Sequence, residues 1–406
     1  MTHTRKWRSL YGRLLPAAAL AALAPFATPA MAQRPVAKPL IIDAHADVPD
    51  PLDHPERTTT IDAGTQVDLD KLRAGGVAAV FLSVHAPKGP PTPAGHQAER
   101  ATADAKLKAI REIALRHPDK AAIAKSAADI RRIAADGKVA IVLGVLNGSP
   151  YAQDTDAVRK LRDQGVRVLG FVHAGNNELA DSSRPLARDV PGANGGLSAL
   201  GRQWVTDANR YGVTLDVSQL TTQALLQTVA LSTAPVLASH SGVRSVIDNP
   251  RNLTDEELHA VANKGGAVCI VAFSLYLISE PPANAQAMQA AMARYGGLKN
   301  GYEGLTPAQR EALYAELNRV ASKATVDQYL DSVDRAVKTI GVDHVCLSTD
   351  FNHGVTGLIG WKDESETGNV TAALRKRGYT DEEIGKLWSG NVLRVLTAVE
   401  HVGSAQ

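Results

Sequence analysis

The stretch PLIIDAHADVPD, residues 39–50, places a histidine and an aspartate two positions apart at the end of an apolar run. In an extended strand, residues i and i+2 point to the same side, so His45 and Asp47 would lie side by side. An imidazole and a carboxylate suit Zn²⁺ and also Mn²⁺, Fe²⁺ or Co²⁺. The pair could therefore hold half of a metal ion's coordination shell, if other parts of the chain supply the rest.

Polar residues that could supply it stand where other apolar runs end. Four runs, VAAVFLSVH, VRVLGFVH, APVLASH and HVCLSTD, end at His85, His173, His240 and Asp350, and the run GVTLDVSQ ends at Gln219. A lone histidine at the end of a strand is usually a hydrogen-bonded structural residue. Several histidines and two carboxylates at such ends, with the His-x-Asp pair at the first, favour a metal site.

The elements that must position these residues form a regular series. The six runs above, together with 139–148 and 266–274, make eight candidate strands rich in Val, Ile and Leu, as expected of strands buried on both faces. Helical patterns lie between them at 155–165, 198–212, 221–232 and 254–266, the last with a Thr N-cap and a Glu three residues on. Strands that alternate with helices predict an α/β chain folded as a (β/α)₈ TIM barrel, whose strand ends converge on one mouth.

Two segments extend this pattern. Residues 278–325 are longer than a simple crossover and predict an insertion after the seventh strand, which would form either a lid or an oligomer contact. The sequence thus leaves a homodimer open. The C-terminal segment TDEEIGKLWSGNVLRVLTAVE predicts two closing helices.

The first 32 residues have the features of a secretory signal peptide. A basic start is followed by an apolar run and by AMA at 30–32, an A-x-A cleavage site. We therefore expect a single barrel domain at 33–406, released into the periplasm or secreted, with no membrane attachment after signal removal. Without the four basic residues of the leader, 40 Lys and Arg face 42 Asp and Glu, a net charge of −2. This balance argues against nucleic acid as a partner.

The chain has two cysteines, Cys269 and Cys346, each inside an apolar run. Two cysteines imply no disulfide framework. We expect both to be buried strand thiols.

Taken together, the motifs resemble a known family. The marks are DAHAD at 43–47, GVRVLGFVHAGNNELADSS at 165–183, PVLASHSGVRSVIDNPRNLTDEEL at 235–258, GVDHVCLSTDF at 341–351 and GNVLRVL at 390–396. In these segments the chain resembles the membrane dipeptidases (renal dipeptidase-like, peptidase family M19) of the amidohydrolase superfamily. The resemblance implies a metallo-dependent hydrolase that cleaves dipeptides on a (β/α)₈ barrel with two zinc ions.

The resemblance also implies roles for individual residues. His45 and Asp47 would bind the first metal, and His240 the second. Asp350 would contact the metal-bound hydroxide and shuttle its proton. His173 would polarise the scissile carbonyl and stabilise the oxyanion. Arg251 would bind the terminal carboxylate of the substrate, a role that suits a planar guanidinium.

Two positions depart from the family pattern. Leu146 stands where the family has a glutamate that bridges both metals, and Gln219 stands where it has a second-metal histidine. A leucine cannot bind a metal, and an amide is a poor ligand for zinc. We therefore expect one zinc, because three protein ligands and a water suffice for a mononuclear site. The ligands would be His45, Asp47 and Asp350, with His240 nearby as a fourth ligand or a proton-transfer group. His85 or His353 could replace a lost ligand, although each is more typical of a loop or rim residue.

Three functions follow from this reading. The first is an exported metallo-dipeptidase or related hydrolase of carboxylate-bearing amides, with an altered site and a small peptide-like substrate. The second is a pseudoenzyme or binding protein that keeps the pocket without turnover. The third is a lyase or other hydrolase whose substrate is not a dipeptide. Metal content measured beside dipeptide hydrolysis separates the first two.

Overall fold

The structure is a computed structural model that describes residues 39–48, 65–86, 92–296, 305–354 and 356–405. The predicted signal peptide at 1–32 lies outside the described residues. Residues from Lys38 to Gln406 form one compact unit. Among the described residues, no helix has the length and apolar character needed to span a membrane.

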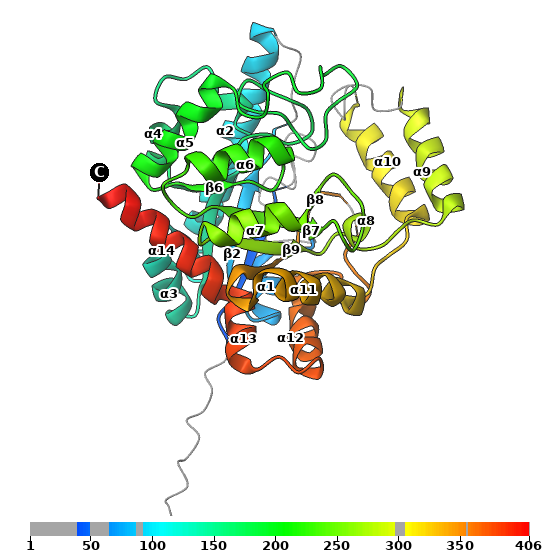
Figure 1. Cartoon of the computed structure of the whole chain (residues 1–406). Coiled ribbons are helices and arrows are strands. Elements are labelled where there is room, and N and C mark those ends of the chain that lie inside the picture. The colour runs from blue at the N-terminus through cyan, green and yellow to red at the C-terminus, as the bar shows by residue number, and fades with distance from the viewer. Residues whose placement is uncertain (1–38, 49–64, 87–91, 297–304, 355, 406) are drawn as a thin grey trace, which may run out of the picture. The chain divides into compact units, whose positions relative to one another are not determined.

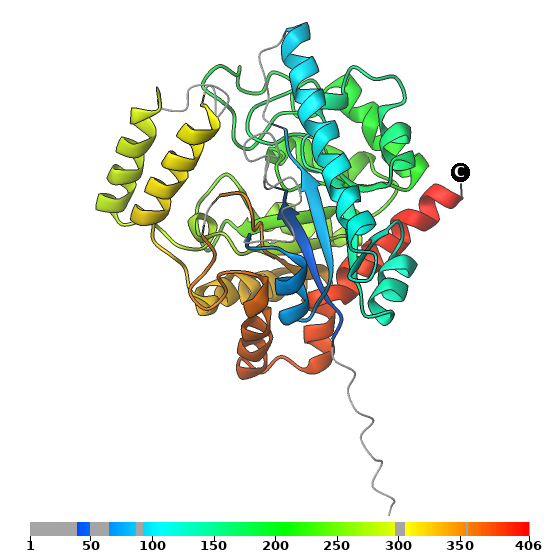
Figure 2. The same cartoon turned by 180° about the vertical axis from the view of Figure 1, so that it is seen from behind.

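All eight predicted strands form, and they pair in parallel. In spatial order they are β1 (Ile41–Asp47), β2 (Val77–Val84), β4 (Val139–Val145), β5 (Val166–Gly170), β6 (Thr214–Asp216), β7 (Leu237–Val243), β9 (Ala267–Val271) and β11 (Val345–Ser348). The view from behind shows the first two strands, β1 and β2, side by side (Figure 2).

The first and last strands meet just beyond their ladders. The N–H of Asp350 donates to the carbonyl of His45 at 2.9 Å, and the N–H of Asp47 donates to the carbonyl of Phe351 at 2.8 Å. These bonds bring the ends of β1 and β11 together and nearly close the sheet. The predicted (β/α)₈ barrel is therefore confirmed, and its closure places the His45–Asp47 pair beside Asp350.

In the described part of the chain, two short strands were not predicted. β3 (Ala121–Ala124) pairs with β4, and β8 (Asn252–Leu253) pairs with β7. The first has the sequence AAIA and the second is only two residues long. Neither has the run of β-branched residues that marks a strand in a sequence.

Helices alternate with the strands along the chain and surround the sheet in space (Figure 1). The four predicted ones are α4 (Ala157–Asp163), α5 (Ala199–Tyr211), α6 (Thr222–Leu231) and α7 (Asp255–Asn263). The capping box predicted for the last of these forms between Thr254 and Glu257. Further helices around the sheet are α1 (Leu69–Ala74), α2 (Pro93–Arg116), α3 (Ala127–Ala135), α8 (Ser274–Leu277), α11 (Val326–Ile340) and α12 (Thr367–Lys376).

The predicted insertion contains a pair of helices that stands apart from the sheet in both views (Figures 1 and 2). They are α9 (Pro282–Arg294) and α10 (Pro307–Val320). Ala291, Leu313 and Leu317 form a small hydrophobic cluster of their own between them. The pair is therefore packed largely on itself.

The C-terminal segment forms α13 (Asp381–Gly385) and α14 (Asn391–Ser404), as the two predicted helices require. A π-helical turn, Lys386–Gly390, joins them. The connection between the two helices is therefore continuous helical backbone.

The core lies on both faces of the strands. Val80 and Leu82 belong to one buried cluster, whereas Phe81 and Val142 belong to another. Alternate residues of one strand thus contribute to different clusters, which explains why these strands read as continuous apolar runs.

The prediction of two free thiols is wrong, because Cys269 and Cys346 form a disulfide. The two residues occupy directly paired positions on the neighbouring strands β9 and β11, with their Cα atoms 4.0 Å apart. Both are fully buried. The sequence showed that each cysteine lies in a buried strand, but their pairing depends on which strands are neighbours.

Candidate metal centre and substrate-binding residues

Three predicted residues converge at the mouth of the barrel. His45 Nε2 lies 3.6 Å from Asp47 Oδ1 and 3.6 Å from Asp350 Oδ1. One ligand atom from each of the three residues lies within 4.8 Å of the others. His45 Nε2 and Asp47 Oδ1 are buried and have no hydrogen-bond partner among the described residues. The arrangement leaves an imidazole nitrogen and a carboxylate oxygen available, and these are atoms that bind a divalent cation.

The backbone holds Asp350 in an unusual conformation. Its φ of 59° lies in the left-handed region, which Asp adopts more readily than most residues with a side chain. Asp43 supports the neighbouring Thr349, since it accepts hydrogen bonds from the N–H and hydroxyl of Thr349 at 3.0 and 2.7 Å. This buried aspartate therefore fixes the strand end that carries Asp350, a role that sequence reasoning missed.

The two carboxylates change the electrostatics of His45. Burial alone would lower the pKa of His45, but the adjacent Asp47 and Asp350 outweigh burial and raise it. For Asp47, burial acts to raise the pKa, while the neighbouring His45 ring lowers it more, and the net pKa is lowered. The site thus favours a positive charge between the imidazole and the carboxylates.

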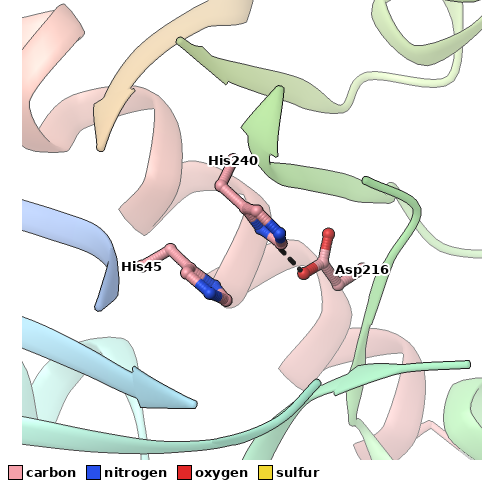
Figure 3. Close-up of side chains that lie close together, drawn as sticks. All are labelled: His45, Asp216 and His240. Carbon is pink, nitrogen blue, oxygen red and sulfur yellow. Dashed lines mark ion pairs between the residues drawn. The ribbon is translucent and has the colours of Figure 1, made fainter. Parts of the chain in front are cut away.

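His240 lies against His45, with the ring centroids 3.7 Å apart (Figure 3). Its Nδ1 is 2.7 Å from Ser239 Oγ, and its Nε2 is 2.9 Å from Nε2 of Gln219. An amide NH₂ can only donate, so the Gln219 side chain occupies the lone pair of His240 Nε2. Burial and the nearby His45 lower the pKa of His240 well below its ordinary value, which keeps the ring neutral.

Asp216 is a further residue that sequence reasoning missed. Its Oδ2 lies 3.8 Å from His240 Nδ1, and it forms a compact cluster with His45 and His240 (Figure 3). Its oxygens already accept hydrogen bonds from the backbone and hydroxyl groups of Ser218 and Ser239. Asp216 therefore anchors the strand ends behind the histidines. The signal was the Asp that ends β6, three residues before Gln219.

The three other predicted histidines lie in two places: two of them face each other, and the third lies next to Asp350. His85 and His173 face each other with ring centroids 4.1 Å apart. Burial and then Lys106 lower the pKa of His85 to about 3, so this ring is neutral. His353 Nδ1 is 2.6 Å from the carbonyl of Asp350 and 3.8 Å from its Oδ2.

His173 also contacts a cation that was not predicted. Nη2 of Arg184 lies 2.7 Å from His173 Nε2. Burial and the nearby His85 lower the pKa of His173 well below its ordinary value. A guanidinium can only donate, so Nε2 accepts and the single proton of the neutral ring lies on Nδ1.

The two departures from the family pattern are both buried. Leu146, directly after β4, is 2% exposed, and its N–H donates to the carbonyl of Val84. Gln219 is 5% exposed and is held between His240 and Arg184. Neither position offers a carboxylate or an imidazole to a second metal.

Arg251, predicted to bind a carboxylate, is only 1% exposed. Its guanidinium donates to the backbone carbonyls of Ser218, just after β6, and of His240, within β7. It also lies 5.4 Å from the ring centroid of Tyr276. Arg251 thus joins two strand ends of the barrel mouth, and its contact with a substrate stays a prediction.

A pocket of about 260 Å³ opens next to this region. Its lining includes Ser183 and Thr221, which are sequence neighbours of Arg184 and Gln219, as well as Arg244. His45, Asp47 and Asp350 do not line it. The pocket is therefore a different space from that of the metal-binding residues.

A (β/α)₈ barrel whose mouth gathers histidines and carboxylates defines the class of metallo-dependent hydrolases. The family model described as membrane dipeptidase (peptidase family M19) matches residues 30–406. The chain belongs to this family, and the predicted membership is confirmed. Membership makes it a dipeptidase-family hydrolase and implies a bound metal.

Similar proteins agree with this assignment. The dipeptidase TcpJ of Claviceps purpurea is 28% identical over 351 residues, which cover 86% of this chain and 72% of that protein. The crystal structure of the probable dipeptidase PvdM of Pseudomonas aeruginosa is 36% identical with a TM-score of 0.80, and the match covers 90% of this chain and 96% of that one. A metallopeptidase of Rhodobacter sphaeroides, liganded with a phosphinate mimic of the dipeptide L-Ala-D-Ala, shares the fold at 22% identity, with a TM-score of 0.71 and coverage of 89% and 100%.

Proposed function

We propose that this chain is an exported, dipeptidase-like hydrolase that works with a single zinc ion bound by His45, Asp47 and Asp350. The observation that carries the proposal is the pair of buried atoms without partners, His45 Nε2 and Asp47 Oδ1, beside the Asp350 carboxylate. Buried polar atoms are nearly always paired, so this pair supports a cation between them. When bound, zinc supplies Lewis acidity and lowers the pKa of water.

The residues of the chain would perform the remaining steps. Asp350 has one carboxylate oxygen toward His45 and the other 3.8 Å from His353. This carboxylate is placed to accept a proton from an attacking water molecule. The neutral ring of His173 carries its proton on Nδ1, and with it the ring would help to position the substrate carbonyl.

Leu146 and Gln219 support a count of one metal. Leucine has no ligand atom, and the Gln219 amide already donates to Nε2 of His240, the residue that the family resemblance assigns to a second metal. An apolar residue at one position and a hydrogen-bonded amide at the other therefore do not fit a second zinc site. No step of the proposed reaction depends on a second ion.

The proposed substrate is a dipeptide or a related amide that carries a carboxylate. Membership of the dipeptidase family supports this class, and so does the dipeptide mimic in the Rhodobacter sphaeroides relative of the same fold. Export is supported by the signal-like leader and by the Cys269–Cys346 disulfide, because disulfides persist in oxidising compartments.

A second candidate function is a binding protein that keeps the pocket and has lost turnover. The loss of ligands at Leu146 and Gln219 favours it, because one cation cannot clamp nucleophile and carbonyl as two can. Both candidates share a substrate class. They differ in whether the bound peptide is cleaved.

The test is elemental analysis of the purified mature protein beside a panel of dipeptides. The proposal expects about one zinc per chain, cleavage that stops when the metal is removed, and recovery when zinc is returned. Asp47→Asn should lose the zinc and the activity together. Asp207→Asn, at a half-buried position on α5, serves as the matched control. A protein that carries zinc and binds dipeptides without cleaving them supports the binding protein. A protein with two tightly bound metals contradicts the single-metal site.

A further inference from the structure

The hydroxyl of Ser239 lies where two histidine rings and a carboxylate meet. Its Oγ is 2.7 Å from His240 Nδ1, 3.2 Å from His45 Nδ1 and 2.5 Å from Asp216 Oδ2. Figure 3 shows the two rings and the Asp216 carboxylate gathered around this region. All four residues are buried, so their polar atoms must find their hydrogen-bond partners inside the protein.

The direction of these hydrogen bonds follows from the protons that each group has. Asp216 accepts from the N–H and the hydroxyl of Ser218 and from the N–H and the hydroxyl of Ser239. A serine has a single hydroxyl proton, so the Ser239 oxygen can only accept from the two rings once its proton points to Asp216. Nδ1 of His45 and Nδ1 of His240 must therefore each carry a proton.

The contacts of Gln219 lead to the same result from the opposite side of His240. A guanidinium can only donate, so the contact of Arg184 Nη2 with Gln219 Oε1 at 3.5 Å turns the amide NH₂ toward His240. This NH₂ donates to His240 Nε2 at 2.9 Å, which leaves the ring proton on Nδ1. The hydrogen bonds thus run in one direction, from a guanidinium that can only donate to a carboxylate that can only accept.

This direction decides how His45 faces the candidate metal centre. When the ring is neutral and its proton lies on Nδ1, the lone pair of Nε2 points toward the carboxylates of Asp47 and Asp350, each 3.6 Å away. A zinc ion binds a histidine through such a lone pair. The tautomer with its proton on Nδ1 is therefore the one that a zinc ligand needs.

Other neighbours of His45 favour the opposite tautomer. The two carboxylates beside Nε2 would accept a proton from that nitrogen. The hydroxyl of Ser83 lies 3.2 Å from Nδ1 and, in the described part of the chain, has no carboxylate to accept its proton, so it is free to donate to Nδ1. Of the two hydroxyl groups at Nδ1, only that of Ser239 is committed to accept.

We propose that Asp216, acting through Ser239, fixes the proton of His45 on Nδ1 and so prepares Nε2 to bind zinc. The inference rests on the proposed function, which makes His45 a zinc ligand. A hydrogen bond to the second nitrogen of a metal-binding histidine orients the ring, selects its tautomer and raises its basicity. Asp216 and Ser239 are thus positioning residues that act on the metal through His45.

The variant Asp216→Asn tests the proposal because it reverses the direction of the hydrogen bonds with little change of shape. Oδ1 of Asp216 accepts the N–H and the hydroxyl of Ser218 and the N–H of Ser239. The amide oxygen of the variant should take this place, so that its NH₂ donates to Ser239 Oγ. The hydroxyl proton of Ser239 is then directed at the two rings, where it opposes a proton on Nδ1.

Two measurements read the effect. In zinc-free protein labelled with ¹⁵N-histidine, NMR shows which ring nitrogen of His240 carries the proton, and His240→Gln assigns the signal. We expect this proton on Nδ1 in the unmodified protein and in part on Nε2 in Asp216→Asn. Zinc affinity, measured against a chelating competitor, should fall about ten- to a hundredfold in Asp216→Asn, as for other groups that support a metal ligand.

Two serine variants provide a matched comparison. Ser239→Ala removes the link to Asp216 and should weaken zinc binding by about tenfold. Ser83→Ala removes a hydroxyl at the same distance from His45 Nδ1 that is not joined to a carboxylate, so it should weaken zinc binding far less. Circular dichroism and thermal melting show which variants are folded. If Asp216→Asn does not fold, the two serine variants and the His240 proton of the unmodified protein carry the test.

Three outcomes overturn the inference. In the first, His240 of the unmodified protein carries its proton on Nε2. In the second, a folded Asp216→Asn keeps either the proton position or the zinc affinity of the unmodified protein. In the third, Ser83→Ala weakens zinc binding as much as Ser239→Ala. A protein that binds no zinc contradicts the proposed function, whereas the proton on His240, which is read without zinc, still decides whether Asp216 sets the tautomer.

Discussion

At the scale of single residues, the candidate metal centre is defined by which buried polar atoms have hydrogen-bond partners. In the described part of the chain, His45 Nε2 and Asp47 Oδ1 have none, whereas Nε2 of His240 is hydrogen-bonded to Gln219. A buried atom without a partner is costly, and a cation removes that cost. The contrast explains why one side of the site suits a metal and the other side suits hydrogen bonds.

This contrast makes the second metal site testable by restoring its ligands. We expect the double change Leu146→Glu with Gln219→His to add a second zinc, because it supplies a bridging carboxylate and frees His240 Nε2. Hydrolysis of dipeptides should rise with it. Each single change should do much less, because ligands of one ion act as a unit. Elemental analysis beside a dipeptide assay checks this, and a second zinc without a gain in rate would indicate a site built for another substrate.

A second prediction at this scale concerns the buried acid Glu364. It is 1% exposed, and Thr367 donates to its Oε2 at 2.6 Å. Burial raises the pKa of Glu364 well above its ordinary value, and the charge of Asp43 raises it further. Between the ordinary pKa and the raised one, the folded protein binds the extra proton, so the free energy of unfolding should fall as pH rises through that window.

Glu364→Gln is neutral at every pH and should flatten this slope. The measurement is urea unfolding at several values between about pH 5 and 8. Glu256→Gln, at an exposed position on α7, is the matched control and should keep the slope of the unmodified protein. Equal slopes for Glu364→Gln and the unmodified protein would show that Glu364 carries no extra proton in the fold.

At the scale of elements, the helical insertion touches the loop that follows Asp350. The side chain of Asn318, on α10, donates to the carbonyl of Gly354 at 2.9 Å and accepts from the N–H of Thr356 at 3.0 Å. His353, in the same loop, packs edge-on against Phe273 with ring centroids 4.9 Å apart. The insertion therefore supports the loop next to a proposed zinc ligand, even though its two helices pack mainly on each other.

We predict that Asn318→Ala weakens zinc binding about tenfold, as loss of a supporting contact around a metal ligand typically does. Removal of the two hydrogen bonds should also lower the free energy of unfolding by about 1–2 kcal/mol. Zinc titration against a chelating competitor and urea unfolding measure the two effects. Asn369→Ala, which removes a hydrogen bond to the Gly360 carbonyl at 2.9 Å, should leave zinc affinity unchanged. Unchanged zinc affinity in Asn318→Ala would separate the insertion from the metal site.

At the scale of the whole molecule, the barrel is held by ties between neighbouring strands. Backbone hydrogen bonds of Asp47 and Asp350 join the ends of β1 and β11, and the disulfide joins β11 to β9. The disulfide closes a stretch with a sequence separation of 77 residues, which includes the insertion and α11. It thus restrains the part of the chain that leads to Asp350.

Reduction of this disulfide should lower the free energy of unfolding by about 4 kcal/mol, the chain-entropy value for a loop of this length. Urea unfolding with and without a reductant measures the difference, with the reductant added to unfolded protein because both sulfur atoms are buried. The double variant Cys269→Ala with Cys346→Ala is the control and should not respond to the reductant. A response equal to that of the control would contradict a stabilising disulfide.

The amino-acid sequence by itself was sufficient to predict the eight strands, their polar ends and the barrel. This is because strands buried on both faces must be continuously apolar, and because strand ends of a parallel barrel converge. The His45–Asp47 pair followed from the two-residue period of a strand, a purely local property. Its meeting with Asp350 followed from the barrel.

Only the tertiary structure decided which groups are partners. The Cys269–Cys346 bond depends on β9 and β11 being neighbours in register, and the anchoring by Asp216 depends on serines from two strands. Arg184 lies in an irregular segment, where no period relates sequence position to direction, so its approach to His173 could not be predicted. Hydrogen bonds and charges act over a few ångströms in space, and a sequence specifies such distances only within one regular element.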